Sequence, residues 1–157
     1  LSHRNGDDGI DTTSGGDVTD SVLISEHVTQ DNGGHGIHVG SNVQATVRGN
    51  ASASNGGNGI FGGATVVENT SRNNDGGGIV SFGLIANNGV SGNTGDEIET
   101  SGSHSTLVIG NNISSSSPVG SALNLSSQTS FINNAIKGVV TGGIDVSGNY
   151  CNGVPCP

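Results

Sequence analysis

The strongest constraint on this 157-residue chain is a block of eleven residues that recurs with a fixed spacing of asparagines. Three copies contain no gap and read NASASNGGNGI, NTSRNNDGGGI and NGVSGNTGDEI, beginning at Asn50, Asn69 and Asn88. Each copy has a second Asn five residues after the first and ends on Ile five residues later. A fixed block with variable lengths between copies is typical of a repeat protein in which each copy is one structural unit.

Apolar residues end each copy along nearly the whole chain and are separated by 19 to 27 residues. These anchors are Ile10, Ile37, Ile60, Ile79, Ile98, Leu123 and Ile144. One asparagine column comprises Asn50, Asn69, Asn88 and Asn134, with His27 in the first copy, and the other comprises Asn32, Asn55, Asn74 and Asn93. Before Leu123, Ile113 and Pro118 take the two asparagine positions, which predicts an insertion or a slip there.

Apolar residues alternate within each copy instead of recurring at a helical spacing. Segments such as NVQATV and GIDVS therefore predict short strands, with Gly and Asn at the corners between them. Coils of this kind stack about 4.8 Å apart around a narrow core, which fits a chain with 29 Gly and 30% apolar residues. Stacked Asn amides can hydrogen-bond between coils, and Asn tolerates the left-handed corner conformation. We predict an all-β chain: a single right-handed parallel β-helix (solenoid) of about seven coils, spanning residues 1–157.

The charge balance limits the partners of the chain. Its 13 acidic and four basic residues give a net charge of −9. This disfavours nucleic acid, which needs a basic surface. An acidic polymer can bind only at a local basic patch or through a bridging cation such as Ca²⁺. No apolar run is long enough to span a membrane. Because the chain begins at Leu1 without a signal-peptide pattern, we expect a processed mature chain or a piece of a longer one.

The repeat also predicts a patch of carboxylates and imidazoles on the first two coils. Asp8 and His35 lie two residues before an anchor, and Asp11 and His38 lie one residue after it. Asp8 is therefore expected over His35, and Asp11 over His38. Such pairs serve as general acid and base or as metal ligands. These four residues are the candidate catalytic residues, and with Asp7 they are the candidate metal ligands. The alternative is that they are solvated side chains beside corners that need glycine.

The Asn-x4-Asn-x4-Gly-Ile rhythm resembles the right-handed parallel β-helix repeat of the pectate-lyase-like superfamily. That superfamily includes pectate lyases, polygalacturonases, mannuronan C5-epimerases and non-catalytic surface proteins. NGDDGI and GGHGI resemble the Asp-Asp and Gly-His-Gly elements of polygalacturonases, which places Asp7, Asp8 and His35 at the matching positions. DGIDTT is similar to an epimerase motif, with two threonines in place of Pro-His. The following coil reads GIFGG, so the cation that polygalacturonases carry there is missing.

The two cysteines lie in the C-terminal segment CNGVPC. Their spacing is not that of a redox Cys-x-x-Cys pair, and no zinc-binding set accompanies them. A disulfide between Cys151 and Cys156 that pins residues 147–157 is expected, which implies an oxidising compartment and a secreted or cell-surface protein. The alternative is a reduced pair.

The sequence therefore predicts an extracellular carbohydrate-associated module that binds polysaccharide rather than cleaving it. The alternative is a structural subunit of a fibre or adhesin that self-associates through its N-terminal coil. That coil, LSHRNGDDGI, has no amphipathic capping helix. A third expectation is a glycoside hydrolase, lyase or epimerase that uses the Asp/His patch. No cofactor is assigned, and Ca²⁺ is the cation considered.

Overall fold

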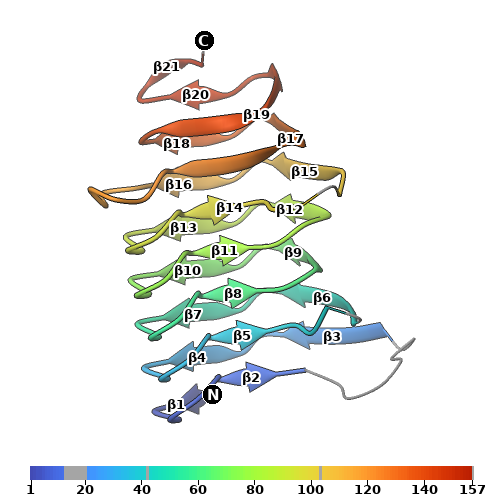
Figure 1. Cartoon of the computed structure of the whole chain (residues 1–157), viewed down its shortest axis with the longest axis vertical. Coiled ribbons are helices and arrows are strands. Elements are labelled where there is room, and N and C mark those ends of the chain that lie inside the picture. The colour runs from blue at the N-terminus through green and yellow to red at the C-terminus, as the bar shows by residue number, and fades with distance from the viewer. Residues whose placement is uncertain (13–20, 42, 103, 157) are drawn as a thin grey trace.

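A computed structural model describes residues 1–12, 21–41, 43–102 and 104–156. Every regular element in these ranges is a β-strand, and the strands stack in coils along the long axis (Figure 1). They are β1 (Ser2–His3), β2 (Ile10–Asp11), β3 (Ser21–Ser25), β4 (Val28–Gln30), β5 (Ile37–His38), β6 (Gln44–Arg48), β7 (Ala51–Ala53), β8 (Ile60–Phe61), β9 (Ala64–Val67), β10 (Thr70–Arg72), β11 (Ile79–Val80), β12 (Leu84–Ala86), β13 (Gly89–Ser91), β14 (Ile98–Glu99), β15 (Thr106–Ile109), β16 (Asn112–Ser114), β17 (Leu123–Ile132), β18 (Ala135–Lys137), β19 (Val140–Ser147), β20 (Tyr150–Cys151) and β21 (Val154–Pro155). Among the described residues there is no helix long and apolar enough to cross a membrane.

The strands form two sheets in which successive coils pair in parallel, so the predicted all-β solenoid is confirmed. One sheet is nine-stranded, in the order β1-β4-β7-β10-β13-β16-β18-β20-β21, and the other is twelve-stranded, in the order β2-β5-β8-β11-β14-β17-β15-β12-β9-β6-β3, with β19 paired to β17. From β1 to β15 each coil supplies three separate strands, which gives about five full turns where the spacing predicts about seven. In the next two coils, β17 and β19 each run through two strand positions.

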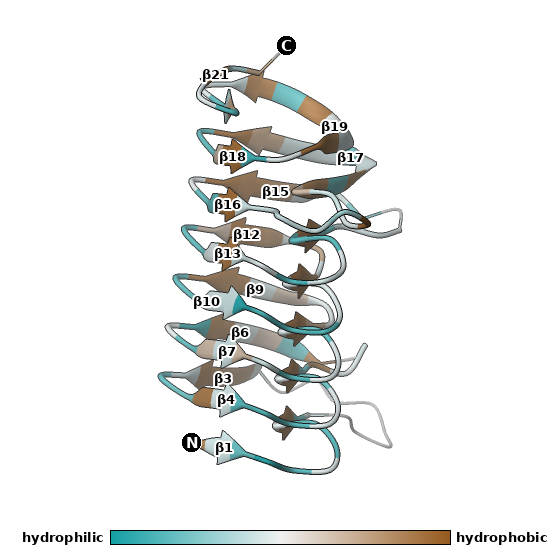
Figure 2. Ribbon diagram, turned by 90° about the vertical axis from the view of Figure 1, so that its left-hand side faces the viewer, coloured by the Kyte–Doolittle hydropathy of each residue, from teal (hydrophilic) through white to brown (hydrophobic). Residues whose placement is uncertain are grey.

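The apolar anchors form one inward-facing row, as predicted for six of them. Parallel pairing links, in order, Ile10, Ile37, Ile60, Ile79, Ile98 and Leu123. All but Ile10 have no exposed surface. Removing such a side chain from water stabilises the fold by roughly 1.5–3 kcal/mol. In Figure 2 the hydrophobic colour runs up the twelve-stranded sheet, for example on β9, β12 and β15, whereas β7 and β10 of the nine-stranded sheet are pale or hydrophilic.

The predicted seventh anchor, Ile144, is wrong. Leu123 pairs with Val140, which takes the anchor position in the last coil, and Ile144 pairs with Ser130 farther along β17. The Ile144 side chain is 52% exposed. The reason is the length of this coil: Leu123 and Val140 are 17 residues apart, and the shortest earlier spacing is 19. The usual spacing therefore points to a residue beyond the true anchor, Val140.

Buried asparagines form the predicted hydrogen-bonded ladders. In the first column, Nδ2 of Asn50 donates to Oδ1 of Asn69 (3.0 Å), and the backbone N–H of Asn50 donates to the same oxygen (2.9 Å). Equivalent pairs of bonds link the later rungs, which are Asn69, Asn88, Asn111, Asn134 and Asn149. Each Nδ2 also donates to a backbone carbonyl, as Asn69 does to Val47 (2.9 Å). The amides thus satisfy polar groups that burial would otherwise leave unpaired.

The irregular copy continues this column through Asn111, so placing Ile113 there is wrong. Asn111 lies twelve residues before Leu123 instead of ten, so the predicted insertion amounts to two residues. Ile113 points into the core and is 1% exposed. Pro118, which the spacing places in the second column, is exposed on the surface.

The second column runs from Asn32 through Asn55 and Asn74 to Asn93, as predicted, and ends on a carboxyl group. Both Nδ2 and the backbone N–H of Asn93 donate to Oε2 of Glu97. Glu97 has no exposed surface, and its Oε1 has no hydrogen-bond partner among the described residues. Burial raises the pKa of Glu97 and outweighs the hydrogen bonds from Asn93, which lower it.

The left-handed conformation expected at the ladder asparagines lies one residue earlier. A positive φ of 54–71° occurs at the residue before each ladder position; these residues are Arg4, Glu26, Asp31, Gly49, Ser54, Glu68, Asn73, Asn87, Gly92, Gly110, Asn133 and Gly148. Non-glycine residues rarely adopt this conformation because of steric strain. Where the corner residue is not glycine and an asparagine follows it, the hydrogen bonds of that asparagine therefore hold the corner in a conformation that its own residue does not favour.

The C-terminal end is a hairpin closed by the predicted disulfide between Cys151 and Cys156. Strands β20 and β21 pair antiparallel, and both cysteines pack against the end of the hydrophobic core. The backbone N–H of Cys156 donates to the carbonyl of Asn149 (3.0 Å), the last rung of the first column. The disulfide thus ties the chain end to the ladder.

Replacing Asn74 by Ala should lower the free energy of unfolding by at least about 2 kcal/mol. The change removes the acceptor of two N–H groups of Asn55 and the donor to Asn93 in a buried site, and each unsatisfied group costs roughly 1–3 kcal/mol. Urea denaturation measures the effect. The matched control is Asn73→Gly at the adjacent corner, where φ is +54° and Gly removes strain. Equal losses for both variants would contradict a ladder-specific role.

Replacing Glu97 by Gln should remove part of the pH dependence of stability. Because the folded-state pKa of Glu97 lies above its usual 4.5, the folded protein binds this proton more tightly than the unfolded chain. The contribution is complete below about pH 4.5 and is lost as pH rises through the folded-state pKa. Denaturation curves at pH 4 to 8 should show wild-type stability falling relative to that of Glu97→Gln. Glu68→Gln, on the surface, controls for the lost charge. Parallel pH profiles for the wild-type protein and the Glu97→Gln variant would contradict the prediction.

Candidate functional site

The predicted carboxylate and imidazole patch lies on β2 and β5 in the first two coils. Asp11 pairs with His38 across these strands, as predicted. Nδ1 of His38 lies 3.0 Å from Oδ2 of Asp8 and 3.5 Å from Oδ1 of Asp11. The side chains of Asp8, His38 and Asp11 are 12%, 24% and 44% exposed. Two carboxylates therefore converge on one imidazole nitrogen in a half-buried position.

The imidazole that faces Asp8 is that of His38, so the expected pairing of Asp8 with the His35 ring is wrong. Asp8 does lie over His35, but its Oδ1 accepts the backbone N–H of that residue. Parallel pairing aligns backbones in this register, and the His35 ring continues onward to the third coil. The sequence spacing identified the right neighbours and could not distinguish backbone contacts from side-chain contacts.

His35 belongs to a hydrogen-bonded column of its own. Its Nδ1 accepts the backbone N–H of Asn58 (2.9 Å), and Oδ1 of Asn58 accepts the N–H of Gly77 (2.6 Å). In the neutral ring the proton is therefore on Nε2. The ring stacks on Phe61, with centroids 4.7 Å apart and planes inclined by 13°. Burial lowers the pKa of His35 and outweighs the raising effect of Asp8.

Fewer residues of this patch can act together as metal ligands than the sequence predicts. Asp8, Asp11 and His38 form the group of potential metal-ligating side chains among the described residues, with ligand atoms within 4.8 Å of one another. Asp7 and His35 lie outside that group. On the third coil the position next to His38 is Phe61, so the missing cation of the polygalacturonase-like pattern is replaced by an aromatic ring.

A second surface, which the sequence analysis missed, is the outer side of the nine-stranded sheet. The outward positions from β4 to β20, which we call the nine-stranded face, are Val28, Gln30, Ala51, Ala53, Thr70, Arg72, Gly89, Ser91, Asn112, Ser114, Ala135, Lys137 and Tyr150. None of these described positions carries a carboxylate, although the chain has a net charge of −9. The acidic side chains are therefore segregated to other surfaces.

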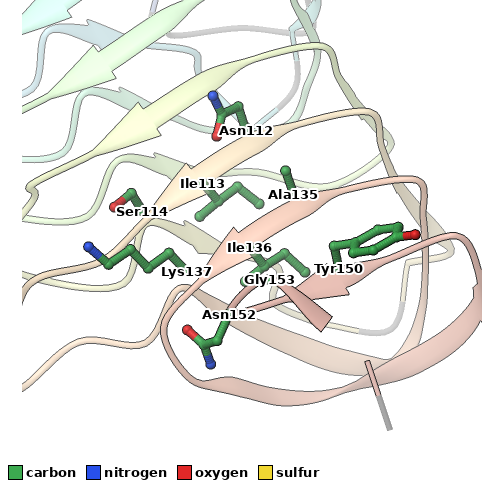
Figure 3. A pocket seen from close by; sticks show the side chains of 9 residues that line it. All are labelled: Asn112, Ile113, Ser114, Ala135, Ile136, Lys137, Tyr150, Asn152 and Gly153. Carbon is green, nitrogen blue, oxygen red and sulfur yellow. The ribbon is translucent and has the colours of Figure 1, made fainter. Parts of the chain in front are cut away.

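Two hollows mark this face. The larger, of about 550 Å³, lies near its C-terminal end and is lined by Asn112, Ser114, Ala135, Lys137, Tyr150 and Asn152, among others. Figure 3 shows Lys137 on one side of it and Tyr150 on the other. The smaller, of about 290 Å³, is lined by side chains from β4, β7 and β10, including Arg72.

The two cations of this face lie in one column. Parallel register aligns Arg72 with Ser91, Ser114 and Lys137 in successive coils. Three strand spacings of about 4.8 Å place the two cations roughly 14 Å apart along the axis. Within the described part of the chain, neither takes part in an ion pair. The outward positions of the nine-stranded face could have been found from the sequence, because they lie one and three residues after a first-column asparagine. Assigning Ile113 instead of Asn111 to that column concealed this regularity.

No family model matches the chain, and no curated protein and no solved structure matches it. The parallel solenoid is established by the parallel pairing of successive coils. The resemblance to the pectate-lyase-like superfamily is carried by the repeat rhythm and the motifs around Asp8 and His35, and membership in that superfamily stays a prediction.

Proposed function

We propose that this protein is an extracellular carbohydrate-associated β-helix module that binds an extended polysaccharide along the nine-stranded face without cleaving it. The observation that carries the proposal is a carboxylate-free face, with two hollows and two cations in one column, on an otherwise acidic chain. An extended polymer matches this shape because the hollows follow one another along the axis.

The larger hollow has the mixed chemistry that a sugar ring requires. Tyr150 is 54% exposed and pairs in register with Ala135. The small Ala135 side chain leaves space beside the Tyr150 ring. An aromatic ring provides apolar contact area with a polar hydroxyl at its edge. Asn112 and Ser114 provide amide and hydroxyl groups from the neighbouring strand. A few polar groups around an apolar surface are typical of small-molecule sites.

The cations favour a polymer that carries carboxylates. Net charge alone disfavours an acidic ligand, but electrostatic attraction between exposed groups is effective only over about 8–10 Å at physiological ionic strength. Among the residues that line the larger hollow, Lys137 is the charged one. We therefore expect a uronate-containing polysaccharide to bind more tightly than a neutral one.

Two observations support binding rather than cleavage. The nine-stranded face has no pair of carboxyl groups to act as acid and base. In the Asp/His patch, Nδ1 of His35 already accepts a backbone N–H, and Phe61 occupies the place of a cation. The disulfide between Cys151 and Cys156 supports an oxidising, extracellular location.

Calorimetric titration with oligogalacturonate and with a neutral cello-oligosaccharide tests the proposal. Tyr150→Ala and Lys137→Gln should each weaken oligogalacturonate binding about tenfold, which corresponds to about 1.4 kcal/mol. The matched controls are Phe82→Ala and Arg48→Gln. The Phe82 ring stacks on His104 and is not part of this face, and Arg48, the last residue of β6, is paired with Glu68. Both controls should retain wild-type affinity.

Failure of both sugars to bind the wild-type protein would contradict the proposed function. Loss of binding in His38→Gln or Phe61→Ala, with Tyr150→Ala unaffected, would move the site to the Asp/His patch. Equal affinity for both sugars would contradict the role given to Lys137. Release of shorter or unsaturated products during incubation would contradict binding without cleavage.

A further inference from the structure

We propose that Asp8, Asp11 and His38 form a binding site for one divalent transition-metal ion, separate from the nine-stranded face. Their carboxylate oxygens and the Nδ1 atom come from two adjacent coils and point to a common position. The proposal does not depend on saccharide binding.

The two distances from Nδ1 of His38 to the carboxylate oxygens are close to those around a tetrahedral ion. Bonds of about 2.1 Å from Zn²⁺ to N and O ligands give a separation of roughly 3.4 Å between ligands. Nδ1 of His38 lies 3.5 Å from Oδ1 of Asp11, which already fits this value. It lies 3.0 Å from Oδ2 of Asp8, so this pair must separate by only a few tenths of an ångström.

The backbone holds these ligands in place before an ion binds. Oδ1 of Asp8 accepts the N–H of His35, which fixes the carboxylate and directs Oδ2 toward His38. Outer hydrogen bonds of this kind orient metal ligands and raise affinity. Parallel pairing of β2 with β5 sets the distance between Asp11 and His38. A rigid solenoid therefore loses little conformational entropy when the ion binds.

The ligand types select the class of ion. Ca²⁺ prefers six to eight oxygen ligands, and this site offers one imidazole nitrogen and two carboxylates. Imidazole with carboxylate suits Zn²⁺ and related ions, and three protein ligands leave a fourth position for water. Two carboxylates balance the charge of a divalent ion, whereas in the absence of an ion they share a single imidazole nitrogen.

Calorimetry with Zn²⁺ and, separately, Ca²⁺ tests the site on the full chain. Wild-type protein should bind one Zn²⁺ at micromolar concentration or below, and Ca²⁺ at least tenfold more weakly. Asp11→Asn and His38→Gln should weaken Zn²⁺ binding at least tenfold. Asp11 is partly exposed, so this variant should fold, and its thermal unfolding in the absence of metal verifies that.

Two controls separate coordination from general charge effects. Asp7→Asn removes the same charge from the same corner. His3→Gln removes another close His–Asp pair, in which Nε2 of His3 lies 3.0 Å from Oδ2 of Asp31. Both should bind Zn²⁺ within twofold of wild type. The proposal is overturned if wild-type protein shows no saturable binding below 1 mM, if Asp7→Asn weakens binding as much as Asp11→Asn, or if His3→Gln abolishes it.

Discussion

The hydrogen bond from one asparagine amide to the next is the interaction on which the structure depends. After the first asparagine of each column, each amide oxygen accepts a backbone N–H and a side-chain N–H from the preceding coil. This holds the preceding residue in a left-handed corner and fixes the height of the next coil. A chain with 30% apolar residues cannot position its corners by core packing alone. The asparagine ladders fix the positions of the corners. The narrow row of isoleucines can then pack between them, and larger core side chains are not needed.

The sequence predicts the repeating part of the molecule well because every regular copy presents the same donors and acceptors. The anchors through Leu123, both asparagine columns and the disulfide follow from residue type and spacing alone. The errors at Ile113 and Ile144 come from coils that are longer or shorter than the rest. The candidate site is less predictable. The spacing places Asp8 beside His35, but only the side-chain directions show that the Asp8 carboxylate contacts the ring of His38. Self-association at the first coil and the right-handed sense of the helix stay predictions.

The two candidate surfaces differ in the property that gives each its chemistry. On the first two coils, outward positions are occupied by Asp8, Asp11 and His38, so negative charge is concentrated beside one imidazole. On the nine-stranded face the only charged outward residues among those described are Arg72 and Lys137, and the other outward residues are neutral. Both surfaces rest on the same backbone, because a coil fixed by its corners leaves outward side chains free to vary.

The ladders also have a direction. Every amide oxygen in a column points toward the first coil and every Nδ2 toward the last, so the amide dipoles add along the axis as peptide dipoles add along an α-helix. The positive end of each column meets a carboxyl group: Asn93 donates to Glu97, and Asn149 donates to Asp145 (2.8 Å). The carboxyl oxygens that accept these hydrogen bonds carry no amide N–H with which to continue the ladder. Each column therefore ends at a carboxyl group, and an acidic side chain at that point is the chemical signal that its chain of amides stops.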